Sequence, residues 1–273
     1  MRSVSPEFYW STPITRSGKS SLVPRGPWIY AFTGLGASYR ADPEALSEVV
    51  PKPLEVSGGD VFTYIVEIVA LSRDAYDLAA EAPDQLYYHE GAFFVKVGYG
   101  GKNYLYCPFM WVDSDVSLLR GLLAGWPKKL AKIALTKLHP MLPDFNKPVG
   151  GLKLGGYVSR AGSTLYRIRV ELVSSEETAT LPLLSEYSFL LPRYFAGIAP
   201  GMETVNELVE FEGEIQLRVW SGLGEVEVSG SINDEVHVFK PLSKVVGYYF
   251  NMLLKPRKVK IIGKIEGFTS SES

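Results

Sequence analysis

Two adjacent lysines, Lys128 and Lys129, have the setting in this sequence that points most directly to chemistry. They follow Trp126 and Pro127, and a proline fixes its own φ and favours extended backbone at the residue before it. A turn of this kind can aim one side chain at a defined position. A neutral lysine amine attacks a ketone to form an iminium, which accepts the electrons released when CO₂ leaves or a C–C bond breaks. The pattern favours an enzyme in which Lys128 is the nucleophile.

The reaction requires a neutral amine, whereas a lysine with the ordinary pKa of about 10.4 is protonated at neutral pH. Two causes would lower the pKa of Lys128: burial in an apolar pocket, or Lys129 as a neighbouring cation. Successive residues of an extended segment face opposite sides, which favours burial, although both causes are compatible with the sequence. The alternative to catalysis is an ordinary solvated turn that carries two charges.

The elements expected around this pair are mostly strands. Runs rich in β-branched and aromatic residues predict strands at residues 61–71, 92–98, 103–112, 151–158, 164–173, 185–191, 208–219, 224–230 and 258–262. Short helices are expected at residues 42–49, 116–125 and 241–254. Asp42 caps the first, and Asp113 or Ser114 caps the second, which Gly125 ends. This order of elements predicts an α+β fold whose domain is antiparallel and β-rich.

Composition limits the class of protein. The net charge of −2 over 273 residues shows no basic excess for binding nucleic acid. Cys107 is the single cysteine, so an internal disulfide is excluded, and its apolar neighbours predict a packing role rather than a nucleophile. The start of the chain lacks the apolar core of a signal peptide, and no apolar run approaches the length of a membrane helix. We therefore expect a soluble cytoplasmic protein with no membrane partner. The three histidines lie far apart without metal-ligand spacing, so no metal is expected.

Several short motifs, one of which contains the lysine pair, occur in order along the chain. They are Thr12-Pro13-Ile14-Thr15, Val23-Pro24-Arg25-Gly26-Pro27, Tyr39-Arg40-Ala41-Asp42, Val49-Val50-Pro51-Lys52-Pro53-Leu54, Met110-Trp111-Val112-Asp113, Gly125-Trp126-Pro127-Lys128-Lys129-Leu130, Val219-Trp220-Ser221-Gly222, Pro241-Leu242 with Val245-Val246, and Leu254-Lys255-Pro256-Arg257. In this ordered set the chain resembles the acetoacetate decarboxylase family over nearly its whole length. The sixth motif is similar to that family's Schiff-base lysine motif, and activation of a lysine by burial or by a neighbouring cation is already known there.

The resemblance implies a β-barrel-like α+β fold, a homo-oligomer, no external cofactor and a small-molecule keto acid or ketone as substrate. It also implies two carboxylates near the lysine that orient substrate or move protons, and a second lysine that modifies the first. The residues that match these roles are Lys128, Lys129, Glu67 and Glu90, with Arg120, Trp126 and Met110 assigned to substrate binding. We expect an irregular N-terminal arm at residues 1–27, one catalytic domain at residues 28–265 and a disordered tail at residues 266–273.

Two departures from the family pattern bear on the substrate. The family's Gly-Arg-Glu-Leu stretch corresponds here to Arg120-Gly121-Leu122-Leu123, so its acid is absent and its arginine is displaced or unrelated. The stretch from Trp28 to Tyr39 also contains no basic residue, where the family's decarboxylase has an arginine. Acetoacetate is therefore expected to be a poor substrate. The first hypothesis is a Schiff-base lyase that decarboxylates a β-keto acid. The alternatives are an aldolase or dehydratase acting on 2-oxo acids with the same lysine, and a non-catalytic barrel that binds apolar ligands.

Overall fold

The structure is a computed structural model that describes residues 10–17, 20–72 and 77–266. Parts of the expected N-terminal arm, and all but the first residue of the expected tail, lie outside these described residues. The elements, in chain order, are β1 (Trp28–Arg40), α1 (Pro43–Ser47), β2 (Glu55–Ser72), α2 (Leu78–Glu81), η3 (Pro83–Gln85), β3 (Tyr87–Tyr99), β4 (Lys102–Val112), α3 (Asp115–Ala124), β5 (Lys128–Leu130), β6 (Lys132–Leu135), β7 (Lys153–Arg160), β8 (Ser163–Leu172), β9 (Phe189–Phe195), β10 (Val205–Val228), η4 (Val236–Phe239) and β11 (Val246–Gly263).

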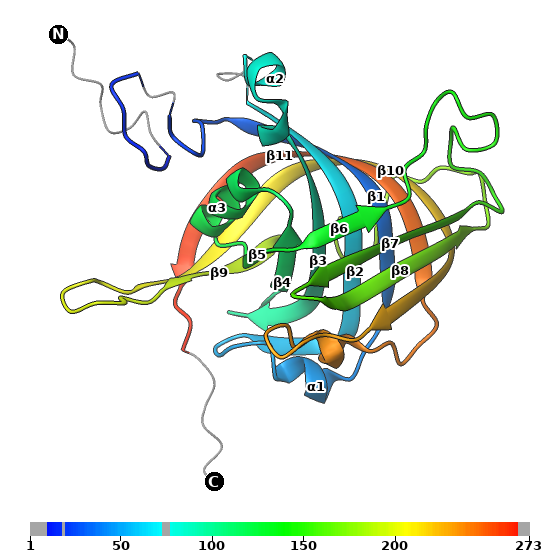
Figure 1. The fold of residues 1–273 in the computed structure, drawn as a ribbon. Coiled ribbons are helices and arrows are strands. Elements are labelled where there is room, and N and C mark those ends of the chain that lie inside the picture. Colours follow the sequence, from blue (N-terminus) through cyan, green and yellow to red (C-terminus); the bar gives the residue numbers. More distant parts are fainter. Residues whose placement is uncertain (1–9, 18–19, 73–76, 267–273) are drawn as a thin grey trace.

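The strands belong to one sheet that curves into a ring. Its order is β11-β1-β2-β3-β4-β9-β10, and a further pairing of β10 with β11 brings the two ends together. Strands β8, β7 and β6 continue outward from β10, so the architecture is a ring within a sheet rather than a true barrel (Figure 1). The pairings are antiparallel except those of β4 with β5 and with β9. The expected antiparallel, β-rich α+β fold with a few short helices is confirmed.

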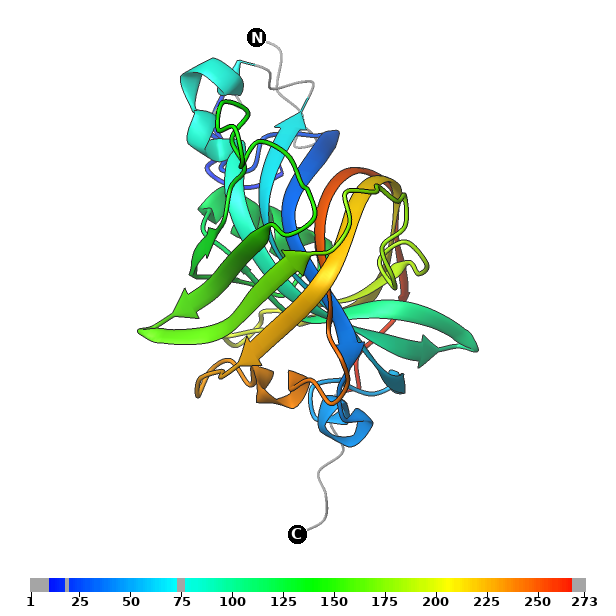
Figure 2. The ribbon, with the colours of Figure 1, turned by 90° about the vertical axis from the view of Figure 1, so that its right-hand side faces the viewer.

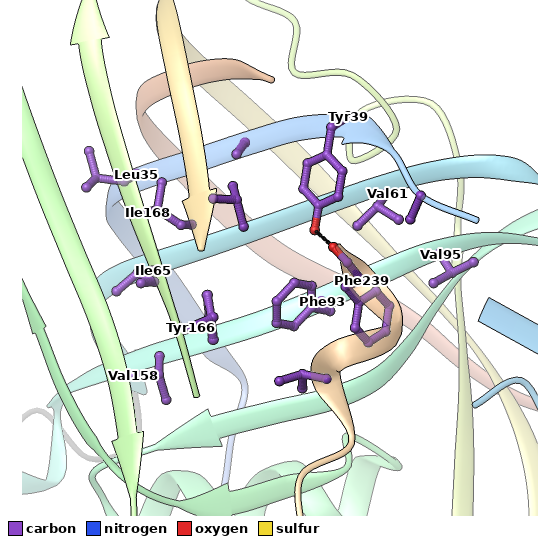
Figure 3. Close-up of a cluster of buried hydrophobic side chains, with 14 of the residues drawn as sticks. Leu35, Tyr39, Val61, Ile65, Phe93, Val95, Val158, Tyr166, Ile168 and Phe239 are labelled. Atoms are coloured by element: carbon purple, nitrogen blue, oxygen red, sulfur yellow. Dashed lines mark hydrogen bonds between the residues drawn. The ribbon is translucent and has the colours of Figure 1, made fainter. Parts of the chain in front are cut away.

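Two buried clusters of side chains lie on opposite faces of the ring strands. The inner core lies inside the ring and receives side chains from all of its strands. The outer core lies between the ring and strands β7 and β8, which cross over the ring strands in Figure 2. Because successive side chains of a strand face opposite sides, neighbours on β3 separate: Phe93 enters the outer core and Phe94 the inner core. Figure 3 shows the outer core, where Phe93 stacks on Phe239 with ring centres 4.4 Å apart.

Two of the expected helices form with the expected end residues. Asp42 accepts a hydrogen bond from the Glu44 backbone N–H at the start of α1. Ser114 caps α3 by accepting from the Ser117 N–H, and Gly125 ends that helix at a φ of 97°, which favours glycine. Helix α3 runs beside β5 and β9 (Figure 1) and buries the face that carries Ser117 and Arg120. None of the helices in the described part of the chain has the length and apolar character that a membrane crossing requires.

The prediction of a helix at residues 241–254 is wrong. Most of that run belongs to β11, which begins at Val246 and pairs with both β1 and β10. Its residues Tyr248 and Tyr249 are buried in the inner and the outer core respectively. A strand that is apolar on both faces loses the alternation that identifies strands, and its apolar run then imitates a buried helix. The two strands expected at residues 208–219 and 224–230 are likewise one continuous strand, β10.

Candidate active site

The inner core contains a cavity of about 810 Å³. Its walls come from β1, β2, β3, β4, β9, β10 and β11, and helix α3 lies along one side. Apolar and aromatic side chains make up most of the lining. The charged side chains among them are Arg25, Glu90, Arg120, Lys128 and Arg193. Ligand sites in proteins have this size and this composition, with a small number of placed polar groups in an apolar wall.

Lys128 is the centre of a buried polar cluster. Its Nζ lies 2.7 Å from Oε2 of Glu90 and donates a hydrogen bond of 2.9 Å to Oγ of Ser117. The other oxygen of Glu90, Oε1, accepts a hydrogen bond of 2.6 Å from the Tyr64 hydroxyl. The side chains of Lys128 and Glu90 are only 6% and 5% exposed, so the pair is almost removed from water. A carboxylate at this distance holds a resting ammonium and can also take its proton.

The helix face beside Lys128 carries a glycine where a larger residue would collide with the lysine side chain. Gly121 of α3 lies against the aliphatic part of that side chain, and a Cβ at this position would overlap Cδ and Cε of Lys128. Glycine inside a helix costs roughly 1 kcal/mol relative to alanine. The close approach of Lys128 therefore gives a physical reason for a helix-interior glycine at this position.

Lys129 points the opposite way. Its Nζ binds Oδ1 of Asp234 at 3.0 Å and also the backbone oxygen of Asn233. Asp234 is fully buried and accepts further hydrogen bonds from Trp111 at 3.0 Å and from Arg160 at 3.2 Å. Burial alone would raise the pKa of Asp234, but the hydrogen bonds from Lys129 and Trp111 outweigh it and lower the pKa. The charge of Lys129 is thus matched on the outer side of the sheet, away from Lys128.

Arg120 is the unusual charge in the cavity. It is 6% exposed, and its Nη1 and Nη2 have no hydrogen-bond partner among the described residues. Its guanidinium lies over the rings of Trp28 at 4.3 Å and Tyr30 at 5.1 Å. Stacking on aromatic faces offsets part of the cost of burying a cation, but unsatisfied donors remain costly. Arg120 lines the cavity, and arginine binds a carboxylate through two parallel hydrogen bonds, so this cation is suited to a carboxylate ligand.

Two tyrosines complete the polar end of the cavity. Burial, followed by the charge of Glu90, raises the pKa of Tyr64 well above its ordinary value. The same two causes, in the same order, raise the pKa of Tyr88 to about 12. Both phenols therefore stay protonated at neutral pH. Tyr88 also links the charged groups, since its ring centre lies 5.3 Å from Nζ of Lys128 and 5.7 Å from the Arg120 guanidinium carbon.

The predicted site residues divide between the two faces of the sheet. Lys128, Glu90, Arg120, Trp126 and Met110 all line the cavity. Glu67 does not: its carboxylate binds Lys137 at 2.7 Å and accepts from Tyr87. Cross-strand partners share a face, and Glu90 pairs with Val66 whereas Glu67 pairs with His89, so the two acids face opposite sides. We give Glu67 and Lys129 no part in the proposed reaction.

Sequence reasoning missed Ser117, Tyr64, Tyr88 and Gly121. One signal was present in the helix, because Arg120 and Gly121 lie three and four positions after Ser117 and share its face. Tyr88 lies two residues before Glu90 on one strand and so shares its face, whereas Tyr64 reaches Glu90 only through strand register. Cys107 is buried, and burial raises its thiol pKa, which agrees with the expected packing role. Among the described residues, no group of histidine, cysteine, aspartate and glutamate is arranged to hold a metal ion.

The site is a lysine buried in the cavity of a ring-shaped sheet. Comparison with known proteins identifies the family to which this fold and site belong. The sequence model of the family described as acetoacetate decarboxylase (ADC) matches residues 11–265. This chain belongs to the acetoacetate decarboxylase family. It is 30% identical over 214 residues to acetoacetate decarboxylase 1 of Mesorhizobium japonicum, which covers 74% of each chain. It is 32% identical over 122 residues to the acetoacetate decarboxylase of Clostridium acetobutylicum, which covers 44% of each chain.

Solved structures confirm the fold. An acetoacetate decarboxylase-like enzyme from Sphingomonas wittichii RW1 superposes with a TM-score of 0.82 at 24% identity, over 94% of this chain and all of the other. The enduracididine biosynthesis enzyme MppR, complexed with the condensation product of pyruvate and imidazole 4-carboxaldehyde, superposes with a TM-score of 0.81 at 21% identity. That match covers 93% of this chain and 95% of MppR. The fold thus occurs in at least one enzyme, MppR, whose bound molecule is not acetoacetate.

Proposed function

We propose that this protein is a Schiff-base lyase in which Lys128 forms an iminium with an oxo acid, and that it decarboxylates a β-keto acid through an enamine. The observation that carries the proposal is the buried amine of Lys128, held 2.7 Å from Glu90 in a cavity large enough for a ligand. Membership of the acetoacetate decarboxylase family supports the lyase class. An oxo acid can reach the amine there without being surrounded by bulk water.

The reaction follows from the groups that surround the lysine. Glu90 takes a proton from the Lys128 ammonium, and the neutral amine attacks the ketone carbon to form a C–N bond. Loss of the former carbonyl oxygen as water leaves the iminium. The electrons of the C–CO₂ bond then flow into the iminium, which releases CO₂ and leaves an enamine. The enamine carbon takes a proton, and water hydrolyses the new iminium to the product ketone and free Lys128. Glu90, held by the Tyr64 hydroxyl, is within reach of the amine for these proton transfers.

Arg120 supplies the positive charge that a buried carboxylate requires. The cavity holds the Lys128–Glu90 pair, whose charges balance, and beside it the guanidinium of Arg120. The carboxylate of an oxo acid would pair with that positive charge. Arg120 thereby takes over the role that the family's decarboxylase assigns to an arginine in the strand that here runs without a basic residue from Trp28 to Tyr39.

A second reaction is favoured by the same arginine. A cation that binds the carboxylate stabilises the starting state from which CO₂ must leave, whereas catalysis requires stronger interactions in the transition state. Aldol, retro-aldol or dehydration chemistry on a 2-oxo acid keeps the carboxylate, so Arg120 would hold it throughout. The structure of MppR with a condensation product of pyruvate adds support for this candidate. Lys128 and its iminium have the same role in both reactions.

The test combines trapping with product analysis. We expect sodium borohydride to reduce the iminium formed with an oxo acid to a stable secondary amine, seen as a mass increase of the intact protein. We expect no such adduct with Lys128→Ala. Release of CO₂ from a panel of β-keto acids would support decarboxylation, and aldehyde-dependent consumption of 2-oxo acids would support the second candidate. Wild-type protein that gives no adduct with any oxo acid would contradict the proposal and favour a non-catalytic binding role.

The proposal has four wider parts, of which the family resemblance implies the homo-oligomer and the absence of an external cofactor. The catalytic residues belong to one domain, residues 28–265. The protein is cytoplasmic and assembles as a homo-oligomer, and it uses no external cofactor.

A further inference from the structure

One wall of the cavity is made of four aromatic side chains in mutual contact. Trp126 meets Phe189 at 5.1 Å and Phe211 at 5.6 Å between ring centres, both edge to face. Phe94 meets Phe189 at 5.8 Å. All four line the cavity that contains Lys128. We call Phe94, Trp126, Phe189 and Phe211 the aromatic pocket. The proposed reaction gives these rings no role.

Strand β3 shows where this pocket lies relative to the lysine. Tyr88, Glu90, Ala92 and Phe94 alternate along the strand and are all buried on its inner side. Arg120 and Lys128 both lie against Tyr88, and Lys128 also binds Glu90. A strand advances about 3.3 Å per residue, so Phe94 lies about 13 Å along the strand from Glu90. The order along the strand is therefore the charged groups, the small Ala92, and then the aromatic pocket.

The volume of the cavity exceeds what a small oxo acid fills. If each non-hydrogen atom takes as much space as a water molecule, about 30 Å³, acetoacetate fills on the order of 200 Å³. The cavity measures about 810 Å³. An acid held between Arg120 and Lys128 would leave the aromatic pocket without a ligand group.

We propose that the substrate is an oxo acid with an aryl substituent, which extends from the ketone carbon at Lys128 into the aromatic pocket. This inference rests on the proposed function and adds the substrate class. A phenyl group fits the pocket chemically, because aromatic rings favour edge-to-face and offset contacts with one another. The carboxylate remains near Arg120, so the substrate lies along β3 with its charged end beside Tyr88 and its apolar end beside Phe94.

The test uses two acids that differ only in the aryl group, 2-oxobutanoate and 2-oxo-4-phenylbutanoate. The apparent dissociation constant of each is measured from the concentration dependence of borohydride trapping. We expect the phenyl compound to bind at least about tenfold more tightly, because a buried phenyl group removes a large apolar area from water. Equal or weaker binding of the phenyl compound, with a clear adduct from 2-oxobutanoate, would overturn this inference alone. Absence of an adduct from both of these acids would overturn this inference, and absence of an adduct from the β-keto acids as well would overturn the proposed function.

Two neighbouring residues provide matched variants. Phe94→Leu removes a ring from the aromatic pocket, whereas Phe93→Leu removes a ring from the other face of the same strand. We expect Phe94→Leu to reduce the preference for the phenyl compound at least about fivefold and Phe93→Leu to retain it. If Phe94→Leu does not fold, Phe211→Leu serves the same purpose. A preference that survives loss of the pocket ring, or that Phe93→Leu lowers equally, would overturn the assignment of the pocket.

Discussion

The two cores of the molecule are built from the same strands, yet they differ in how completely they are filled. In the outer core, Phe93 stacks on Phe239 at 4.4 Å and also contacts Tyr166 at 4.6 Å (Figure 3). On the inner side of the same strand, Phe94 borders a cavity of about 810 Å³. Close packing is the rule for protein interiors, and a large void forfeits contacts that would stabilise the fold. The inner core gives up that stabilisation, and under the proposed function its cavity holds a ligand.

The two cores also differ in how completely their buried polar groups are hydrogen-bonded. Asp234 in the outer region is fully buried and accepts hydrogen bonds from Lys129, Trp111 and Arg160. Arg120 in the inner core is also buried, but two of its nitrogens have no partner among the described residues. Buried polar groups in folded proteins are normally satisfied, so an exception calls for an explanation. The comparison teaches that strand alternation can direct two lysines that are adjacent in the sequence to opposite cores, one to Asp234 and one to the cavity.

The largest expected effect separates the two lysines. We expect Lys128→Ala to lower the rate of borohydride trapping with 2-oxobutanoate by at least about 1,000-fold, because no other amine lies beside Glu90 in the described cavity. Lys129→Ala should change this rate by less than about tenfold, since its charge is directed to Asp234. Initial rates of adduct formation by mass spectrometry measure both. Similar losses in the two variants would mean that the two faces are not functionally distinct.

Truncation of neighbouring phenylalanines compares the packing of the cores. We expect Phe93→Ala to lower the free energy of unfolding by about 3–5 kcal/mol, as is usual for a fully packed aromatic residue. Phe94→Ala should cost less, because its ring borders a cavity that already exists. Urea unfolding of both variants measures the difference, provided that the slope of each transition is unchanged. A larger loss for Phe94→Ala would contradict the account of one filled and one hollow core.

Replacing Arg120 tests whether the cavity of the inner core binds a carboxylate. We expect Arg120→Met to weaken binding of 2-oxobutanoate by about 10- to 100-fold, the value of one or two charge-assisted hydrogen bonds. The variant should be at least as stable as the wild type without ligand, because it removes a buried cation with unsatisfied donors. Trapping titrations and thermal unfolding give the two results. A clear loss of stability with unchanged binding would make Arg120 a structural residue.

The smallest expected effect concerns Asp234 and pH. Burial opposes its charge, but the hydrogen bonds from Lys129 and Trp111 hold its pKa below the ordinary value. A carboxyl whose pKa is lower in the folded state stabilises the fold above its unfolded pKa of about 3.9, and this contribution disappears as the pH falls through the folded pKa. The stability difference between wild type and Asp234→Asn should be constant near neutral pH and shrink below about pH 4. A difference that persists to acid unfolding would show that the charge of Asp234 is unimportant.

The sequence predicts the parts of the fold and site that depend on local signals. The caps Asp42 and Ser114, the terminal Gly125 and the strands around Phe93 all follow from residue type and spacing. Lys128 follows from its motif after Pro127. These features depend on residues close together in the chain, whose physical preferences act before any tertiary contact.

The remaining features depend on register and tertiary contact. Glu67 and Glu90 are both acids in apolar strands, and only the pairing of Glu90 with Val66 shows which acid faces the cavity. The first part of strand β11, residues 247–250, is buried on both faces, so its sequence lacks the period of two that would distinguish it from a helix. The sequence assigned Arg120 to substrate binding. That two of its nitrogens lack a hydrogen-bond partner among the described residues can be seen only in the folded structure.

The identity of the lysine that carries the substrate tests the central claim most directly. The measurement is peptide mapping of wild-type protein after sodium borohydride treatment with 2-oxobutanoate. The account predicts that the reduced adduct is on Lys128, the lysine that faces the hollow core beside Glu90. An adduct on Lys129, or on a lysine outside the cavity, would contradict it.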